Sequence, residues 1–113
     1  MTLDDYAQWA ASVPQPDHAS RAERLAYAAL GLAGEAGEVA DSVRRGMREG
    51  VVNEDRLLYE LADLLFHWVS LCVELGQPPA AMIARSRVNI EERLVRRVVN
   101  PFARPHPEEN SRN

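Results

Sequence analysis

Residues 54–75 read EDRLLYELADLLFHWVSLCVEL, and this stretch decides the fold class. Its apolar residues fall nearly all round a helical wheel, so we expect a helix that is buried on most sides. One seam has heptad-like spacing and is expected to lie in the core. That seam consists of Leu57, Leu61, Leu64, Trp68, Leu71 and Leu75.

The same stretch keeps one narrow polar stripe. A carboxylate is costly to bury unless it is paired or coordinated, so acids on a buried helix indicate a compensating interaction. The stripe follows a single line of the wheel and consists of Glu60, Asp63, His67, Ser70 and Glu74.

The rest of the chain also has helical spacing. It predicts a short helix over 3–13, a long helix that Ser20 caps and that ends near Arg45, before Gly46, and a fourth helix over 80–98. No stretch alternates with the period of two residues that strands show, so the predicted fold class is all-α. The two central helices are expected to pack as an antiparallel hairpin, because their connection is short.

Length and composition predict one domain. A chain of 113 residues has room for one core, which we expect to span residues 1–100. Residues 101–113 are rich in Pro, Glu, Asn and Arg, and are predicted to form a flexible tail. Several helices carry apolar residues on more than one face, so we expect the four-helix bundle to be completed by oligomerisation.

Charge and cysteine usage exclude several classes of protein. The formal charge of −4 disfavours nucleic-acid binding. Arginines crowd the C-terminal third, where they form either a solvated helix face or a site for a phosphate-bearing small molecule. A lone cysteine, Cys72, fits a reducing compartment. With no secretory signal and no apolar stretch of membrane-spanning length, we predict a cytoplasmic protein without membrane contact.

The long second helix carries Glu35 and Glu38 on one flank of its own apolar seam. We expect that seam to contain Leu25, Ala29, Leu32, Ala36, Val39 and Val43. In both central helices the acids are offset from the seam in the same rotational sense, so antiparallel packing would bring them to one edge of the hairpin. Gly31, Gly34 and Gly37 are expected to remove side-chain bulk beside the acids.

Four converging carboxylates repel one another unless a cation neutralises them. Oxygen ligands without cysteine select Mg²⁺, with Mn²⁺ as a substitute. The same acid pairs also occur as ordinary solvated helix residues. A di-iron carboxylate bundle has the wrong spacing, because it needs Glu-x-x-His and the nearest histidine is His67. A helical oligomerisation or binding module without chemistry remains an alternative.

Two further residues allow two interpretations each. His67 is either a hydrogen-bonded interior histidine or a ligand, and it is also a candidate for the base-binding pocket beside the acids. Trp9 either caps the core or stacks on a base.

Two segments resemble the MazG-like all-α nucleoside triphosphate pyrophosphohydrolases. They are residues 31–41, GLAGEAGEVAD, and residues 60–65, ELADLL, and their sequence is similar to that of a phage-like branch of the family. That family has an E-E-x-x-E cluster on one helix and E-x-x-D on the next. Here Gly34 occupies the place of the first acid. The resemblance covers roughly residues 20–97.

The resemblance implies Mg²⁺-dependent hydrolysis of a (d)NTP to the monophosphate and pyrophosphate, in the house-cleaning of nucleotide pools. The implied metal ligands and catalytic residues are Glu35, Glu38, Glu60 and Asp63. Family members are dimers or tetramers, so the resemblance also implies a homodimer or homotetramer.

The resemblance further implies substrate contacts from the last helix. Asn89 matches the family's substrate-binding asparagine, whereas Glu92 stands where the family has lysine. We expect Arg93 and Arg96 to replace that lysine. Arg45, next to Arg44, stands where the family often has lysines, and His67 and Trp9 complete the predicted substrate-binding set.

Overall fold

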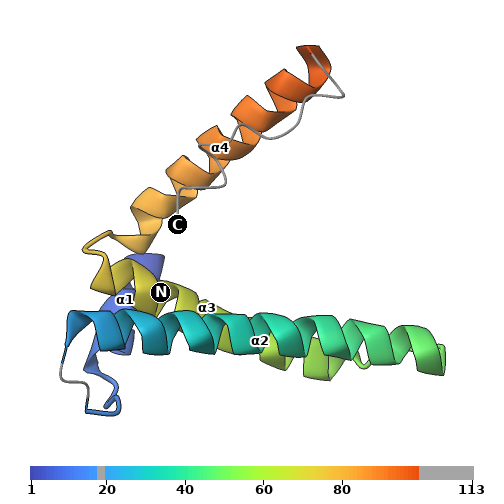
Figure 1. Ribbon diagram of the computed structural model, residues 1–113, viewed down its shortest axis with the longest axis horizontal. Coiled ribbons are helices and arrows are strands. Elements are labelled where there is room, and N and C mark those ends of the chain that lie inside the picture. Colours follow the sequence, from blue (N-terminus) through green and yellow to red (C-terminus); the bar gives the residue numbers. More distant parts are fainter. Residues whose placement is uncertain (18–19, 100–113) are drawn as a thin grey trace. The chain divides into compact units, whose positions relative to one another are not determined.

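The computed structural model describes residues 1–17 and 20–99 and contains four α-helices (Figure 1). They are α1 (Leu3–Ser12), α2 (Arg21–Glu49), α3 (Glu54–Glu74) and α4 (Pro79–Val99). No strand occurs in these residues, which confirms the all-α class. None of the described helices is both long enough and apolar enough to cross a membrane.

Side-chain caps explain where three of the helices begin. Ser20 accepts a hydrogen bond from the Glu23 backbone N–H at the start of α2, as predicted. Thr2 and Asp5 form a reciprocal capping box at α1, and Asn53 caps α3. Each cap satisfies a backbone donor that the first turn of a helix leaves without a partner.

The predicted end of the second helix was wrong. α2 continues through Gly46 to Glu49 and ends at Gly50, whose φ of 84° is the left-handed conformation that glycine favours. Gly46 has a different role, since a Cβ there would lie 2.5 Å from Val52 Cγ2 and 2.7 Å from Val52 Cα. The glycine therefore permits close packing rather than termination.

Helices α2 and α3 form the predicted antiparallel hairpin, and α1 packs on another side of α3 (Figure 1). Arg24 near the start of α2 contacts Glu74 at the end of α3, whereas Gly46 near the end of α2 packs on Val52 just before α3. On the α1 side the core is formed by Ala7, Ala10 and Val69, with Leu3, Tyr6, Phe66 and Trp68 packed against it.

The predicted seam of α2 was partly wrong. Ala29, Ala36 and Val43 are exposed, whereas Ala28, Ser42 and Gly46 are buried. The predicted seam was based on the hydrophobicity of the residues and not on their size. Two helices approach each other most closely where their side chains are small. The packed face of α2 is rotated toward its acids as a result, and Glu35 lies on that face.

The expectation that α3 is buried on most sides was also wrong for the single chain. Leu58 is 63% exposed, and Leu61, Leu65 and Leu75 are exposed as well. We call Leu58, Leu61 and Leu65 the exposed leucine strip, since they recur at helical spacing along one side of α3.

The chain divides into two compact units, Met1–Ala80 and Ala81–Asn113. The described part of the second unit is helical and carries an Arg87–Glu91 ion pair of 2.7 Å. The predicted flexible tail, residues 101–113, lies outside the described residues, and the single domain over 1–100 stays a prediction.

Candidate functional site

Three of the four predicted acids meet across the hairpin. Glu35 comes from α2, and Glu60 and Asp63 come from adjacent turns of α3. One carboxylate oxygen from each lies within 4.8 Å of the others. We call these three residues the acid cluster. It forms because residues three apart share a helix face and because the small residues of α2 turn Glu35 toward α3.

Electrostatics within the acid cluster are unfavourable to full ionisation. A side-chain hydrogen bond with Glu60 raises the pKa of Glu35 above its ordinary value, and burial and the charges of Asp63, Glu60 and Glu38 act in the same direction. When the carboxylates are ionised, the buried Glu35 Oε2 has no hydrogen-bond donor among the described residues. An unpartnered buried oxygen among oxygen-only donors fits a hard divalent cation, because the cation would supply both the missing partner and the missing positive charge.

Glu38, the fourth predicted acid, is not part of this cluster. Its side chain is 51% exposed and forms an ion pair of 3.6 Å with Arg56 of α3. Such a long, exposed pair contributes little to stability, so Glu38 can exchange partners at small cost. Its role as a metal ligand stays a prediction. Arg56 was missed from the sequence, although it precedes Glu60 by one helical turn.

The glycines of α2 do not act alike. A Cβ at Gly31 would collide with the imidazole ring of His67, so Gly31 lets that ring pack onto the α2 backbone. A Cβ at Gly34 or Gly37 would meet no atom of the described residues within 4 Å. These two glycines lie on the exposed side of α2, and the expectation that they relieve crowding beside the acids was wrong.

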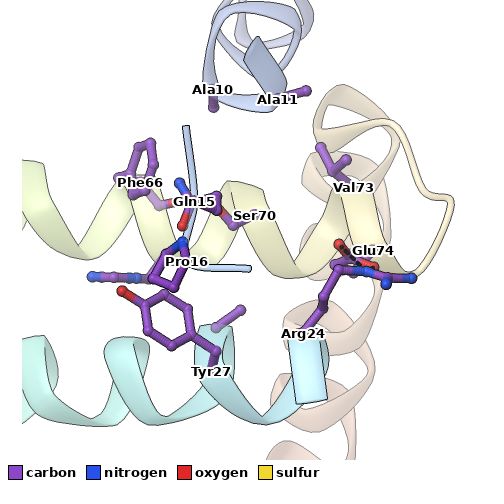
Figure 2. A pocket seen from close by; sticks show the side chains of 12 residues that line it. Ala10, Ala11, Gln15, Pro16, Arg24, Tyr27, Phe66, Ser70, Val73 and Glu74 are labelled. Carbon is purple, nitrogen blue, oxygen red and sulfur yellow. Dashed lines mark hydrogen bonds and ion pairs between the residues drawn. The ribbon is translucent and has the colours of Figure 1, made fainter. Parts of the chain in front are cut away.

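A cavity of about 180 Å³ is lined by residues of α1, of the start of α2 and of α3 (Figure 2). His67 in this lining follows Asp63 of the acid cluster by one helical turn. Tyr27, Phe66 and Pro16 contribute apolar walls, and His67 also lines the cavity. Figure 2 shows Arg24 and Glu74 paired at one side, where Arg24 Nε donates to Glu74 Oε1 at 3.1 Å. We call this the aromatic cavity.

Trp9 packs beside the aromatic cavity and does not line it. Its ring lies 5.4 Å from that of Tyr6 and 6.2 Å from that of Phe66, between centroids. Trp9 thus covers the α1–α3 core through these rings while one side stays exposed. His67 meets Phe66 edge to face at 5.6 Å.

The remaining predicted substrate residues lie elsewhere. Arg45 Nε is 2.8 Å from Asp41 Oδ2, and Arg44 also pairs with this acid. The Arg44 hydrogen bond is the main cause that lowers the pKa of Asp41. Asn89, Arg93 and Arg96 belong to α4 in the second unit, so their part in a site stays a prediction.

Comparison with known proteins identifies the family of this chain. The profile of the MazG nucleotide pyrophosphohydrolase domain matches residues 25–100, which include the acid cluster. The Gene 37 protein of Mycobacterium phage L5 is 33% identical over 82 residues, which cover 68% of this chain and 72% of the phage protein. No solved structure matches the chain significantly. The chain belongs to the MazG nucleotide pyrophosphohydrolase family.

Proposed function

We propose that the protein is a Mg²⁺-dependent nucleoside triphosphate pyrophosphohydrolase that cleaves a (d)NTP between its α and β phosphates. The observation that carries this proposal is the meeting of Glu35, Glu60 and Asp63 within 4.8 Å in a chain of this family. The products would be the (d)NMP and pyrophosphate. The proposed role is the removal of unwanted or non-standard nucleotides.

The acid cluster, together with Glu38, would hold Mg²⁺ or Mn²⁺. A bound divalent cation supplies positive charge that offsets the phosphate charge and lowers the pKa of a coordinated water. Glu38 would join the ligand set by leaving its weak pair with Arg56. The oxygen of water would form a bond to the α phosphorus, and the bond from that phosphorus to the bridging oxygen would break.

The nucleoside would occupy the aromatic cavity. Its tyrosine and phenylalanine rings suit an aromatic base. In this proposal His67 borders both the cavity and the acids, and Trp9 supports Phe66 from behind. Arg45 and the α4 residues Asn89, Arg93 and Arg96 would contact the phosphates.

We also propose a homodimer or homotetramer. The exposed leucine strip on α3 supports this, because an apolar line along a helix commonly marks a protein interface. Light scattering after gel filtration should give the mass of two or four chains, and Leu61→Asp should lower that mass. A monomeric wild type at micromolar concentration would refute this part.

The activity is tested with a panel of (d)NTPs and Mg²⁺, by separating nucleotide products and measuring pyrophosphate. We expect (d)NMP and pyrophosphate from the wild type and their loss in Glu60→Gln and Asp63→Asn. Glu54→Gln, an exposed acid in the first turn of α3, is the matched control and should stay active. Activity surviving in Asp63→Asn would refute the site, and release of orthophosphate would refute the cleaved bond. An inert wild type that Mg²⁺ does not stabilise would favour the non-catalytic binding module.

A further inference from the structure

A second cavity, of about 150 Å³, lies where α2 ends and α3 begins. Its polar lining comes from Ser42, Arg45 and Glu49 of α2 and from Asn53 and Arg56. We call it the arginine cavity. The proposed function assigns Arg45 to the phosphates but gives the other residues of this lining no role.

Ser42 is the unusual member of this lining. The residue is 5% exposed, and its Oγ has no hydrogen-bond partner among the described residues. A buried hydroxyl without a partner destabilises a protein, whereas alanine would fill the same close-packed position without that cost. A buried hydroxyl without a partner, in the same lining as two arginines, indicates a ligand that accepts hydrogen bonds.

The charges of the arginine cavity favour an anion. Arg45 is bonded to Asp41, and Arg56 forms a long pair with Glu38 and also acts on the charge of Asp41. A guanidinium has five N–H donors, so these pairs leave donors of both arginines for a ligand. Glu49 is the opposing carboxylate in the lining. Two guanidinium groups and a hydroxyl suit a phosphoryl group, which arginine binds with two parallel hydrogen bonds.

The position of the arginine cavity relates it to the acid cluster. Ser42 follows Glu38 by one turn of α2, and Arg56 precedes Glu60 by one turn of α3, so the cavity begins about 6 Å along the helices from the acids. The aromatic cavity lies on the opposite side of the cluster, toward the start of α2. The hairpin therefore carries an apolar cavity, three carboxylates and a cationic cavity in a row.

We propose that the arginine cavity binds the terminal phosphoryl groups of the nucleotide, so that Ser42 and Arg56 hold the pyrophosphate end during cleavage. Naming the nucleotide rests on the proposed function, whereas phosphoryl binding by the cavity does not. Free inorganic pyrophosphate would bind the same groups.

The test is isothermal titration of inorganic pyrophosphate into the full chain, with and without Mg²⁺. Ser42→Ala should bind roughly tenfold more weakly, because it loses a hydrogen bond to a charged group. Its melting temperature should not fall, since an unpartnered buried hydroxyl is removed. Glu49→Gln should bind more tightly, because a repelling charge is removed. Arg48→Gln, an exposed cation on α2 outside the cavity lining, is the matched control and should bind as the wild type does.

Nucleotide kinetics on the same variants separate this inference from the proposed function. We expect Ser42→Ala to raise KM for the nucleotide and to weaken product inhibition by pyrophosphate. If the wild type hydrolyses nucleotides but Ser42→Ala and Glu49→Gln leave pyrophosphate affinity unchanged, the arginine cavity is not the site. If pyrophosphate binding responds as expected but no nucleotide is hydrolysed, the phosphoryl site stands and the proposed enzymatic function fails.

Discussion

Glu35→Gln is expected to stabilise the metal-free protein and to abolish its stabilisation by Mg²⁺. Without a cation, Glu35 faces Glu60 and Asp63 within 4.8 Å and keeps a buried oxygen without a partner. Glutamine has nearly the same shape and carries no charge, and its N–H₂ group can donate hydrogen bonds to the neighbouring carboxylates. The variant should remove repulsion without creating a cavity.

The size of this effect follows from the spacing of the cluster. At 4.8 Å, two unit charges repel by about 3 kcal/mol at an effective dielectric constant of 20 and by about 1 kcal/mol in water. The three acids are half-buried, so solvent screens them substantially and the lower figure applies. Glu35 has two such neighbours, so the expected gain is about 1–2 kcal/mol, and each kcal/mol raises the melting temperature of a domain of this size by about 4–8 °C.

The effect should depend on pH in a defined direction. Because the pKa of Glu35 is raised in the folded protein, the folded state binds protons more tightly than the unfolded state does. The stability of the metal-free wild type should therefore fall as the pH rises from the ordinary pKa of 4.5 through the raised value. Glu35→Gln lacks this titration, so its advantage should be larger at neutral pH than at pH 4.5.

Thermal denaturation followed by circular dichroism measures both effects, in EDTA and over a series of Mg²⁺ concentrations. The wild type should gain stability with the logarithm of the metal concentration above the dissociation constant, whereas Glu35→Gln should not. Glu54→Gln controls for the loss of a carboxylate and should retain the Mg²⁺ response. A Glu35→Gln protein that is less stable than the wild type in EDTA, or equally stabilised by Mg²⁺, would show that the acids do not repel or do not form the site.

Three further predictions concern packing and the helix ends. Gly31→Ala should destabilise the fold by about 1–3 kcal/mol, because the new Cβ would collide with the His67 ring. Gly34→Ala should stabilise the fold by up to about 1 kcal/mol, because alanine has the higher helix propensity and its Cβ would meet no described atom within 4 Å. Chemical denaturation of this matched pair checks the α2–α3 packing, and equal effects would contradict it. Gly50→Ala should cost about 1 kcal/mol in urea denaturation, because alanine is strained at φ 84°; a neutral result would mean that the turn differs. Burial raises the pKa of the Cys72 thiol, so it should react slowly with a thiol reagent until the protein is denatured, and rapid labelling of the native protein would contradict its packing.

Helix boundaries were largely predictable from local chemistry. Ser20 acts through the backbone of its own segment, so its effect does not depend on the rest of the fold. Gly46 shows the limit of this reasoning. A glycine near the end of a helix usually terminates that helix. Gly46 instead leaves the space beside its own Cα to Val52, which comes from the following segment.

The choice among the four acids was not predictable from the helical wheel. Both pairs have the correct spacing, yet α2 turns Glu35 toward α3 and leaves Glu38 beside Arg56. A helical wheel gives the angles between the residues of one helix, but it does not show on which face of that helix the partner helix packs. Small side chains determine the packed face of α2. Ala28, Ser42 and Gly46 allow α3 to approach more closely than the larger residues of the predicted seam would.

The sequence by itself determined the all-α class, the antiparallel hairpin and the two pairs of acids, because helical periodicity and capping are local properties of the chain. Only the tertiary structure decided which carboxylates meet, which glycines are essential and where the two cavities lie. These features depend on how closely α2 and α3 approach and on their register. Both are set by contacts between residues that are distant in the sequence, such as Gly31 with His67 and Arg24 with Glu74.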